Sequence, residues 1–350
     1  MTHINANPWR WRGVRRALCA CGAVGWVVVG PAAALAQDGN TVQAVAQVAP
    51  AVPQRDIRQW LQRLHEASRK RTYMGTFVVS AGNEIAASRI WHVCNGEQQL
   101  ERIQTLTGKP RITLRRNDEV MTWVPEQRLV WKEKRDTLRL FPDLLQLPGQ
   151  AIVQWYSAQV VGTERVADLP ATVVDFVPKD AWRFGYRVWS EQTTGLALKL
   201  QTRDAQGRVL EQVAFTELDL QAPIKPHKLL RQMANTDGYQ VLSPQLQSTT
   251  PEAEGWRLSA DVPGFKTMGC HTRHDVAGSA PMQWVFSDGL ATVSLFVETF
   301  DPQRHTKEQT QYRGATYLLS RRKGAHWVTA MGEVPADTLH QFVQRLERVR

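Results

Sequence analysis

The sequence predicts an α+β fold made mostly of antiparallel β-sheet. Short strand-like runs recur along most of the chain, turn-forming residues separate them at regular spacing, and only a few segments show helical periodicity. The pattern is clearest in residues 182–218, where three runs of alternating apolar and polar residues predict three consecutive antiparallel strands. Such a meander has one apolar face, which must cover a core or a cavity.

The first 36 residues predict a secretory signal peptide. Four arginines between positions 10 and 16 precede the uncharged run 17–30, and Ala34-Leu35-Ala36 matches a cleavage site. The apolar run is shorter than the ~20 residues that a membrane-spanning helix needs. We expect cleavage after Ala36, which removes four arginines and lowers the formal net charge from +10 to +6. The remaining positive charge favours acidic partners, such as lipid headgroups or an acidic protein segment, and we expect no nucleic acid partner after export.

The chain of 350 residues is long enough for about two domains. Its composition predicts a flexible leader (37–53), a first domain (54–222), a proline-rich linker (223–253) and a second domain (254–350).

The first domain is predicted to open with a helix from Asp56, whose apolar residues Ile57, Trp60, Leu61 and Leu64 recur at helical spacing. Strands are then expected at 73–80, 87–94, 99–105, 110–115, 119–124, 128–132, 158–165 and 171–177, before the meander. Residues 141–154 fit a short helix or a lid over the concave side of the sheet.

In the linker, residues 228–233 fit one short helix. The second domain is predicted to hold strands at 264–272, 282–287, 291–298, 316–320 and 327–333, with hairpin turns at 287–289 and 322–324. A closing helix is expected from Pro335 because Leu339, Phe342 and Val343 begin an apolar stripe.

Cysteines and histidines provide the nearest approach to a metal site. Cys94 and Cys270 remain after cleavage; two separate thiols are the favoured interpretation, and a disulfide between the two domains stays open. A zinc-dependent hydrolase would have to use Cys270, His271 and His274, but zinc needs four ligands and the chain has no Cys-x-x-Cys motif. Neither a Gly-x-Ser-x-Gly elbow nor a glycine-rich phosphate loop occurs. We therefore expect a protein that is not an enzyme and has no cofactor and no metal.

Many short motifs in a fixed order resemble the MucB/RseB family, over about residues 54–345. They are YMGTFV (73–78), RIWH (89–92), ER (101–102), GKPR (108–111), DEV (118–120), RFGYRVW (183–189), TGL (194–196), the segments 207–211 and 215–216, SDGLA (287–291) and GEVP (332–335). Cys94, the turn 168–170 and the HTRH segment 271–274 depart from the family pattern.

The family consists of periplasmic negative regulators of the sigma-E or AlgU type of envelope-stress sigma factor. The resemblance implies a lipoprotein-carrier-like curved sheet (a half-barrel) with helices in its concavity, plus a smaller α+β C-terminal domain. It also implies a periplasmic protein that binds the periplasmic domain of a membrane anti-sigma factor and protects that domain from regulated proteolysis. Release would follow when lipopolysaccharide or lipoprotein acyl chains occupy the protein.

Tryptophan-rich apolar surface agrees with this binding role, since ten tryptophans remain after cleavage. The candidate lipid-binding residues are Phe77, Trp91, Trp123 and Trp131, and the candidate partner-binding residues are Trp284, Phe286 and Asp288. The alternative function is a periplasmic carrier of lipids or lipoproteins. Whether the chain forms a homo-oligomer is left open by the sequence.

Overall fold

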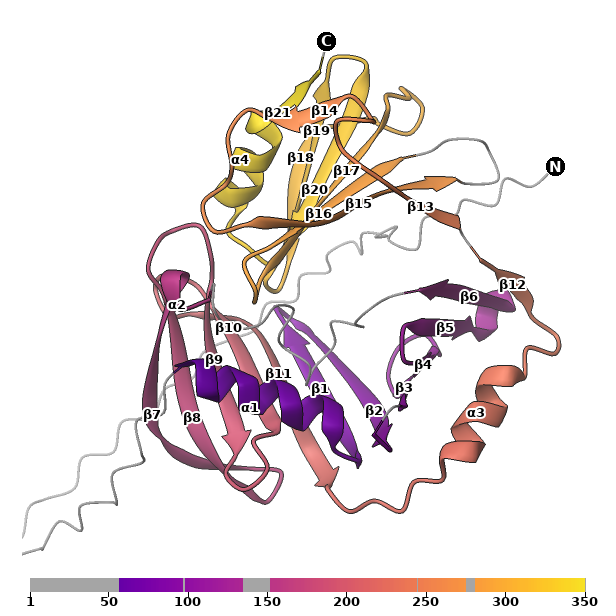
Figure 1. Ribbon diagram of the computed structural model, residues 1–350, viewed down its shortest axis with the longest axis vertical. Helices are drawn as coiled ribbons and strands as arrows, with labels where there is room; N and C mark the ends of the chain where they lie inside the picture. The colour runs from indigo at the N-terminus through magenta and orange to yellow at the C-terminus, as the bar shows by residue number, and fades with distance from the viewer. Residues whose placement is uncertain (1–56, 97, 135–151, 244, 275–280, 350) are drawn as a thin grey trace, which may run out of the picture. The chain divides into compact units, whose positions relative to one another are not determined.

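A large, mostly antiparallel sheet forms from the first two-thirds of the chain. The computed structural model describes residues 57–96, 98–134, 152–243, 245–274 and 281–349. Within these residues, twelve strands pair in the order β12-β6-β5-β4-β3-β2-β1-β11-β10-β9-β8-β7 (Figure 1). They are β1 (Tyr73–Ala81), β2 (Glu84–Cys94), β3 (Gln99–Thr105), β4 (Ile112–Arg116), β5 (Glu119–Val124), β6 (Leu129–Lys134), β7 (Tyr156–Val166), β8 (Leu169–Pro178), β9 (Gly185–Glu191), β10 (Ala197–Arg203), β11 (Val209–Asp219) and β12 (Gln240–Leu242). The mostly antiparallel α+β class is confirmed.

The sheet is open, because β12 and β7 are edge strands. The predicted meander is β9, β10 and β11, which are neighbours in the sheet. A short 3-10 helix, η1 (Pro125–Gln127), joins β5 to β6. The segment predicted as a short helix or lid lies mostly outside the described residues, and its described end is the short helix α2 (Ile152–Trp155).

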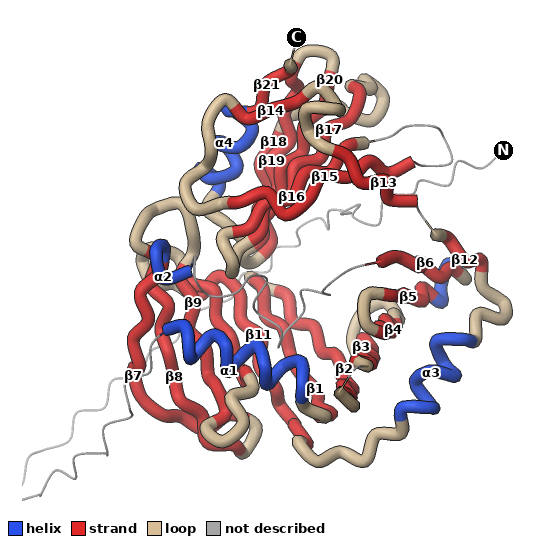
Figure 2. Tube along the Cα trace, in the orientation of Figure 1, coloured by secondary structure: helices blue, strands red, loops and turns tan. Residues whose placement is uncertain are grey.

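Helix α1 (Ile57–Lys70) covers one face of this sheet (Figures 1 and 2). Its apolar stripe is buried, as the helical spacing predicted, with Trp60, Leu61 and Leu64 all at most 3% exposed. These side chains join one apolar cluster with sheet residues such as Phe77 and Phe215, and with Ile152 of α2. We call this set the α1 cluster.

The opposite face of the sheet carries a second helix. Helix α3 (Pro226–Ala234) buries Leu229 and Met233 against Trp123 and its neighbours on β3 to β6. The linker prediction at 228–233 therefore located a helix, although this helix lies on the other side of the sheet from α1.

The remaining residues build a smaller sheet. In the described C-terminal part, seven strands pair in the order β13-β15-β16-β17-β20-β19-β18, and β14 and β21 form a separate pair. Their bounds are β13 (Gln245–Thr249), β14 (Trp256–Leu258), β15 (Lys266–His274), β16 (Met282–Ser287), β17 (Thr292–Thr299), β18 (Gln309–Arg313), β19 (Thr316–Lys323), β20 (His326–Gly332) and β21 (Leu346–Arg348). Helix α4 (Ala336–Arg345) packs on this sheet through Leu339, Phe342 and Val343.

The described helices include none with both the length and the apolar character required to cross a membrane. The predicted signal peptide and leader lie outside the residues that the structure describes.

Candidate functional site

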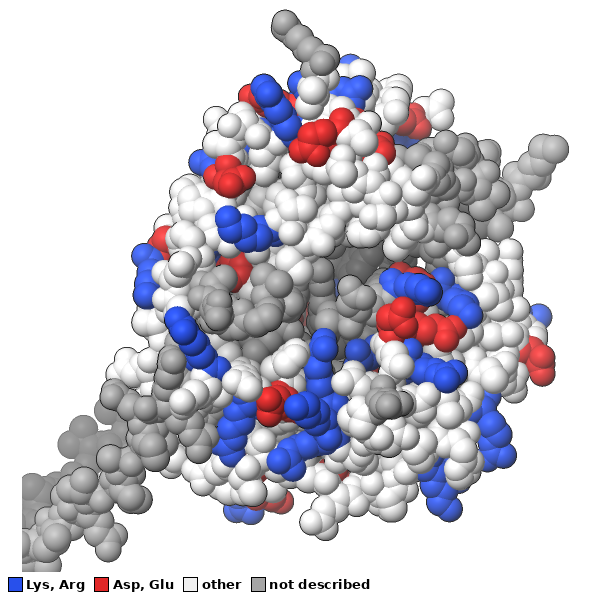
Figure 3. Space-filling model, in the orientation of Figure 1, with Lys and Arg blue, Asp and Glu red and all other residues white. Residues whose placement is uncertain are grey.

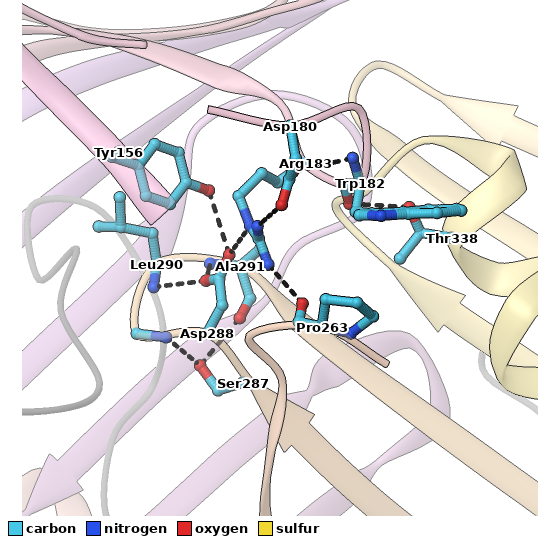
Figure 4. Close-up of polar contacts among 11 residues, drawn as sticks. Tyr156, Asp180, Trp182, Arg183, Pro263, Ser287, Asp288, Leu290, Ala291 and Thr338 are labelled. Atoms are coloured by element: carbon cyan, nitrogen blue, oxygen red, sulfur yellow. Dashed lines mark hydrogen bonds and ion pairs between the residues drawn. The ribbon is translucent and has the colours of Figure 1, made fainter. Parts of the chain in front are cut away.

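The two sheets meet at a buried arginine. Arg183 comes from the loop between β8 and β9, and Asp288 comes from the turn between β16 and β17. Their side chains are both 0% exposed, and Nε of Arg183 lies 2.8 Å from Oδ2 of Asp288 (Figure 4). An ion pair without solvent therefore connects the loop of the large sheet to a hairpin of the small one. We call Arg183 and the groups that contact it the Arg183 junction.

Every nitrogen of the Arg183 guanidinium has an acceptor. Nε donates to Asp288, Nη1 donates to Asp180, and Nη2 donates to the carbonyl oxygen of Pro263 at 2.8 Å. The rings of Trp155 and Phe265 lie 4.8 and 5.3 Å from the guanidinium carbon. Arginine suits such a site because its planar cation is weakly hydrated and stacks on aromatic rings.

Asp288 also organises its own hairpin. Its Oδ1 accepts the backbone N–H groups of Leu290 and Ala291 at 3.0 and 2.8 Å, while Oδ2 accepts the Tyr156 hydroxyl at 3.2 Å. Burial raises the pKa of Tyr156 well above its ordinary value, so the phenol stays protonated and remains a donor. Both carboxylate oxygens are thus used, which compensates for the loss of solvent around the charge.

Two glycines allow the backbones to approach this junction. A Cβ on Gly264 would clash with Nη2 of Arg183 and lie 2.8 Å from the Trp155 ring, and the φ angle of Gly264 is +83°. A Cβ on Gly289 would lie 2.7 Å from Ile152 of α2. Both positions therefore require glycine for space as well as for backbone conformation.

Other contacts join the same parts of the chain. The hydroxyl of Thr338, in α4, donates to the carbonyl oxygen of Trp182 at 2.7 Å. The backbone N–H of Ala315 donates to Glu211 of β11 at 3.3 Å, and burial raises the pKa of that carboxyl group. These hydrogen bonds hold the small sheet and its helix against the large sheet.

The predicted partner-binding residues are buried. Trp284 and Phe286 are 5% and 3% exposed and pack in the core of the small sheet, where Phe286 meets Phe342 of α4. Asp288 lies in the Arg183 junction. The structure therefore places none of the three where a protein partner could reach it directly.

The predicted lipid-binding residues divide between two faces. The strand register places Phe77 and Trp131 on the face of the sheet that α1 covers, and Trp91 and Trp123 on the face that carries α3. Trp123 packs under α3, and Trp91 stacks on the Arg102 guanidinium at 4.3 Å. The four residues cannot line one cavity, because the register assigns them to opposite faces.

Two surface hollows lie beside the turn between β7 and β8. Their volumes are about 400 and 530 Å³, and both contain Arg165 and Asp168. Figure 3 shows a surface on which Lys and Arg side chains are mixed with Asp and Glu. Charged, open hollows do not suit an acyl chain.

The cysteine and histidine residues are not arranged as a metal site in the described part of the chain. Cys270 is 4% exposed and packs in the small-sheet core, whereas the neighbouring His271 points to the other face of β15. Burial raises the pKa of Cys270 to about 11, which disfavours the thiolate that zinc requires. The side chain of His274 lies outside the described residues.

We expect one fast-reacting thiol in the native protein that lacks residues 1–36. Cys94 and Cys270 are both free, but only Cys94 is partly exposed. A colorimetric thiol reagent at pH 8 should label one cysteine quickly and the second only after denaturation, as read by absorbance and by mass spectrometry of the labelled peptide. Rapid labelling of Cys270 would contradict the burial that the structure shows.

The fold and the junction define a class of two-sheet proteins, in which an open, mostly antiparallel sheet with a covered apolar face is joined to a smaller α+β unit. The model of the MucB/RseB N-terminal domain matches residues 56–233, and that of the MucB/RseB C-terminal domain matches residues 250–347. The chain belongs to the MucB/RseB family.

Curated relatives carry regulatory names. The sequence is 29% identical over 298 residues to the sigma factor AlgU regulatory protein MucB of Pseudomonas aeruginosa, covering 83% of this chain and 90% of the relative. It is 22% identical over 291 residues to the sigma-E factor regulatory protein RseB of Escherichia coli, covering 82% and 89%.

Solved structures agree with this assignment. The structure of MucB in complex with MucA(peri) is 25% identical to this chain, with a TM-score of 0.64 over 84% of this chain and 100% of that one. The structure of the Pseudomonas aeruginosa MucA/MucB complex is 25% identical, with a TM-score of 0.65 over 84% of this chain and 99% of that one.

Proposed function

We propose that this chain is an exported periplasmic regulator that binds the periplasmic domain of a transmembrane anti-sigma factor. Bound there, it protects the anti-sigma factor from regulated proteolysis, and it releases the factor when envelope-derived lipid or lipoprotein occupies it. The observation that carries the proposal is membership of the MucB/RseB family across both domains, together with a relative solved in complex with MucA(peri).

The lipid part of the proposal is supported by the α1 cluster. Its sheet face and the stripe of α1 are apolar, including Phe77 and Phe215, whose rings meet edge to face at 6.2 Å. Acyl chains bind by burying hydrocarbon surface, so we assign them to this face and keep Phe77 and Trp131 as candidate contacts. Trp91 and Trp123 are no longer candidates, because they lie on the α3 face.

The coupling between lipid and partner is supported by the Arg183 junction. The junction connects the large sheet, where we place the lipid, to the small one through buried contacts. A ligand that favours one arrangement of these contacts can oppose a ligand that favours another.

Protection from proteolysis tests the function directly. We expect the purified protein, without residues 1–36, to bind the periplasmic segment of the anti-sigma factor from the same organism and to slow its cleavage by the site-one protease. Cleavage would be followed by gel with and without one equivalent of the protein, and an exported protein of similar charge would be the control. An unchanged cleavage rate would contradict the proposal.

A carrier of lipids or lipoproteins remains the second candidate, favoured by the apolar face beneath α1. It predicts that bound lipid is transferred to acceptor vesicles and that anti-sigma cleavage is unaffected. The same cleavage assay, with a vesicle-transfer assay beside it, separates the two functions.

A further inference from the structure

A side chain from the small sheet enters the apolar cluster of the large one. Leu290 belongs to the turn between β16 and β17, yet it packs against the α1 cluster, whose buried members include Ile152 and Tyr156. The turn lies close to Ile152 of α2, since a Cβ added at Gly289 would clash with the Ile152 side chain. One aliphatic side chain of the second domain thus occupies part of the hydrocarbon surface of the first.

This side chain is held by the junction already described. Asp288, two residues before Leu290 in the turn, accepts the backbone N–H of Leu290 at 3.0 Å, pairs with Arg183 and accepts the Tyr156 hydroxyl. Leu290 cannot leave the α1 cluster by much without moving Asp288, because two residues separate it from the end of β16. Insertion of Leu290 and formation of the ion pair are therefore mechanically linked.

We propose that Leu290 is a plug in the acyl-chain site. This rests on the proposed function: when a hydrocarbon chain enters the α1 cluster, it takes the surface that Leu290 covers, expels the turn, and separates Asp288 from Arg183. The occupant is an acyl chain because it takes the place of the aliphatic Leu290 side chain, whose surroundings in the α1 cluster are Ile152 and aromatic rings. By linkage, whatever holds the Asp288 turn in place weakens lipid binding, and lipid loosens the junction.

Shortening the plug should strengthen lipid binding. We expect Leu290→Ala to lower the dissociation constant for a fluorescent 16-carbon fatty acid by about tenfold, because less apolar contact must be given up to admit the chain. The matched control is Val209→Ala, which removes a side chain that is 49% exposed at the start of β11. An unchanged or larger dissociation constant for Leu290→Ala would overturn the proposal.

Expulsion of the turn can be observed at position 290 itself. In a Cys94→Ser/Cys270→Ala background, Leu290→Cys should react slowly with a maleimide, because position 290 packs against the α1 cluster. It should react at least ~10 times faster when the fatty acid saturates the protein, because expulsion of the turn exposes it. Val209→Cys in the same background should react at one rate throughout. Protection of Cys at position 290 by the fatty acid would overturn the plug.

The outcomes also separate this proposal from the proposed function. If the protein shields the anti-sigma segment but binds no fatty acid, the plug fails while the regulatory role stands. If fatty acid binds and Leu290→Ala responds as expected but the segment is not shielded, the plug stands and the carrier function is favoured.

Discussion

Arg183→Ala is expected to destabilise the protein by about 3 to 5 kcal/mol, the usual effect of removing one partner of a buried ion pair. Asp288 is 0% exposed and would keep a charge without the cation that balances it. The free energy of unfolding would be measured in urea, with tryptophan fluorescence and far-UV circular dichroism compared, because the two sheets can unfold separately.

Two controls sharpen this prediction. Arg165→Ala removes an arginine whose ion pair with Asp168 is mostly exposed, and it should change stability by less than about 1 kcal/mol. The double variant Arg183→Met/Asp288→Asn keeps an acceptor for the hairpin but removes both charges, and it should be more stable than Arg183→Ala alone. An Arg183→Ala protein as stable as the Arg165→Ala control would show that the junction does not hold the sheets together.

Gly264→Ala is expected to lower the free energy of unfolding by about 2 to 4 kcal/mol, combining strain at a positive φ angle with overpacking. The new methyl group would meet the guanidinium of Arg183 on one side and the Trp155 ring on the other. Because both neighbours belong to the junction, the methyl group should also displace Arg183 from the Pro263 carbonyl oxygen and from the Trp155 ring.

The chain offers a matched control for this substitution. Gly238 has a similar φ angle of +78°, but a Cβ there would find nothing within 4 Å. Gly238→Ala should therefore show the backbone strain alone, about 1 kcal/mol, in the same urea titration. Equal effects of the two substitutions would mean that the packing around Gly264 is looser than the structure indicates.

Local patterns in the sequence were sufficient for most of the fold. Alternation and turn residues located the meander β9 to β11, and helical spacing located α1, whose stripe Trp60, Leu61 and Leu64 is buried. β18 was missed because Gln309–Arg313 is a polar edge strand without apolar alternation.

Predicting the candidate lipid site required the register of the strand pairs. Spacing along one strand determines which of its own residues share a face of the sheet. Whether Trp91 of β2 and Trp131 of β6 lie on the same face depends on the register of every strand pair between them. The register places them on opposite faces. No local signal in the sequence determines the register of four successive strand pairs, from β2 to β6.

The burial of the candidate partner residues Trp284 and Phe286 has a reason that the sequence contains. Phe342 and Leu339 on the closing helix required an apolar surface to cover, and Trp284 and Phe286 supply it. The role of Arg183 was beyond sequence reasoning, because two of its three acceptors, the carbonyl oxygen of Pro263 and Asp288, lie 80 and 105 residues away along the chain.

Lipid and the anti-sigma segment are expected to oppose each other on this protein. Isothermal titration of the protein with the periplasmic segment of the anti-sigma factor, with and without a saturating acylated ligand such as lipopolysaccharide, tests this claim directly. We expect the segment to bind at least ~10 times more weakly when the lipid is bound, the effect of a coupling free energy of ordinary size. Equal affinity in the two titrations would contradict it.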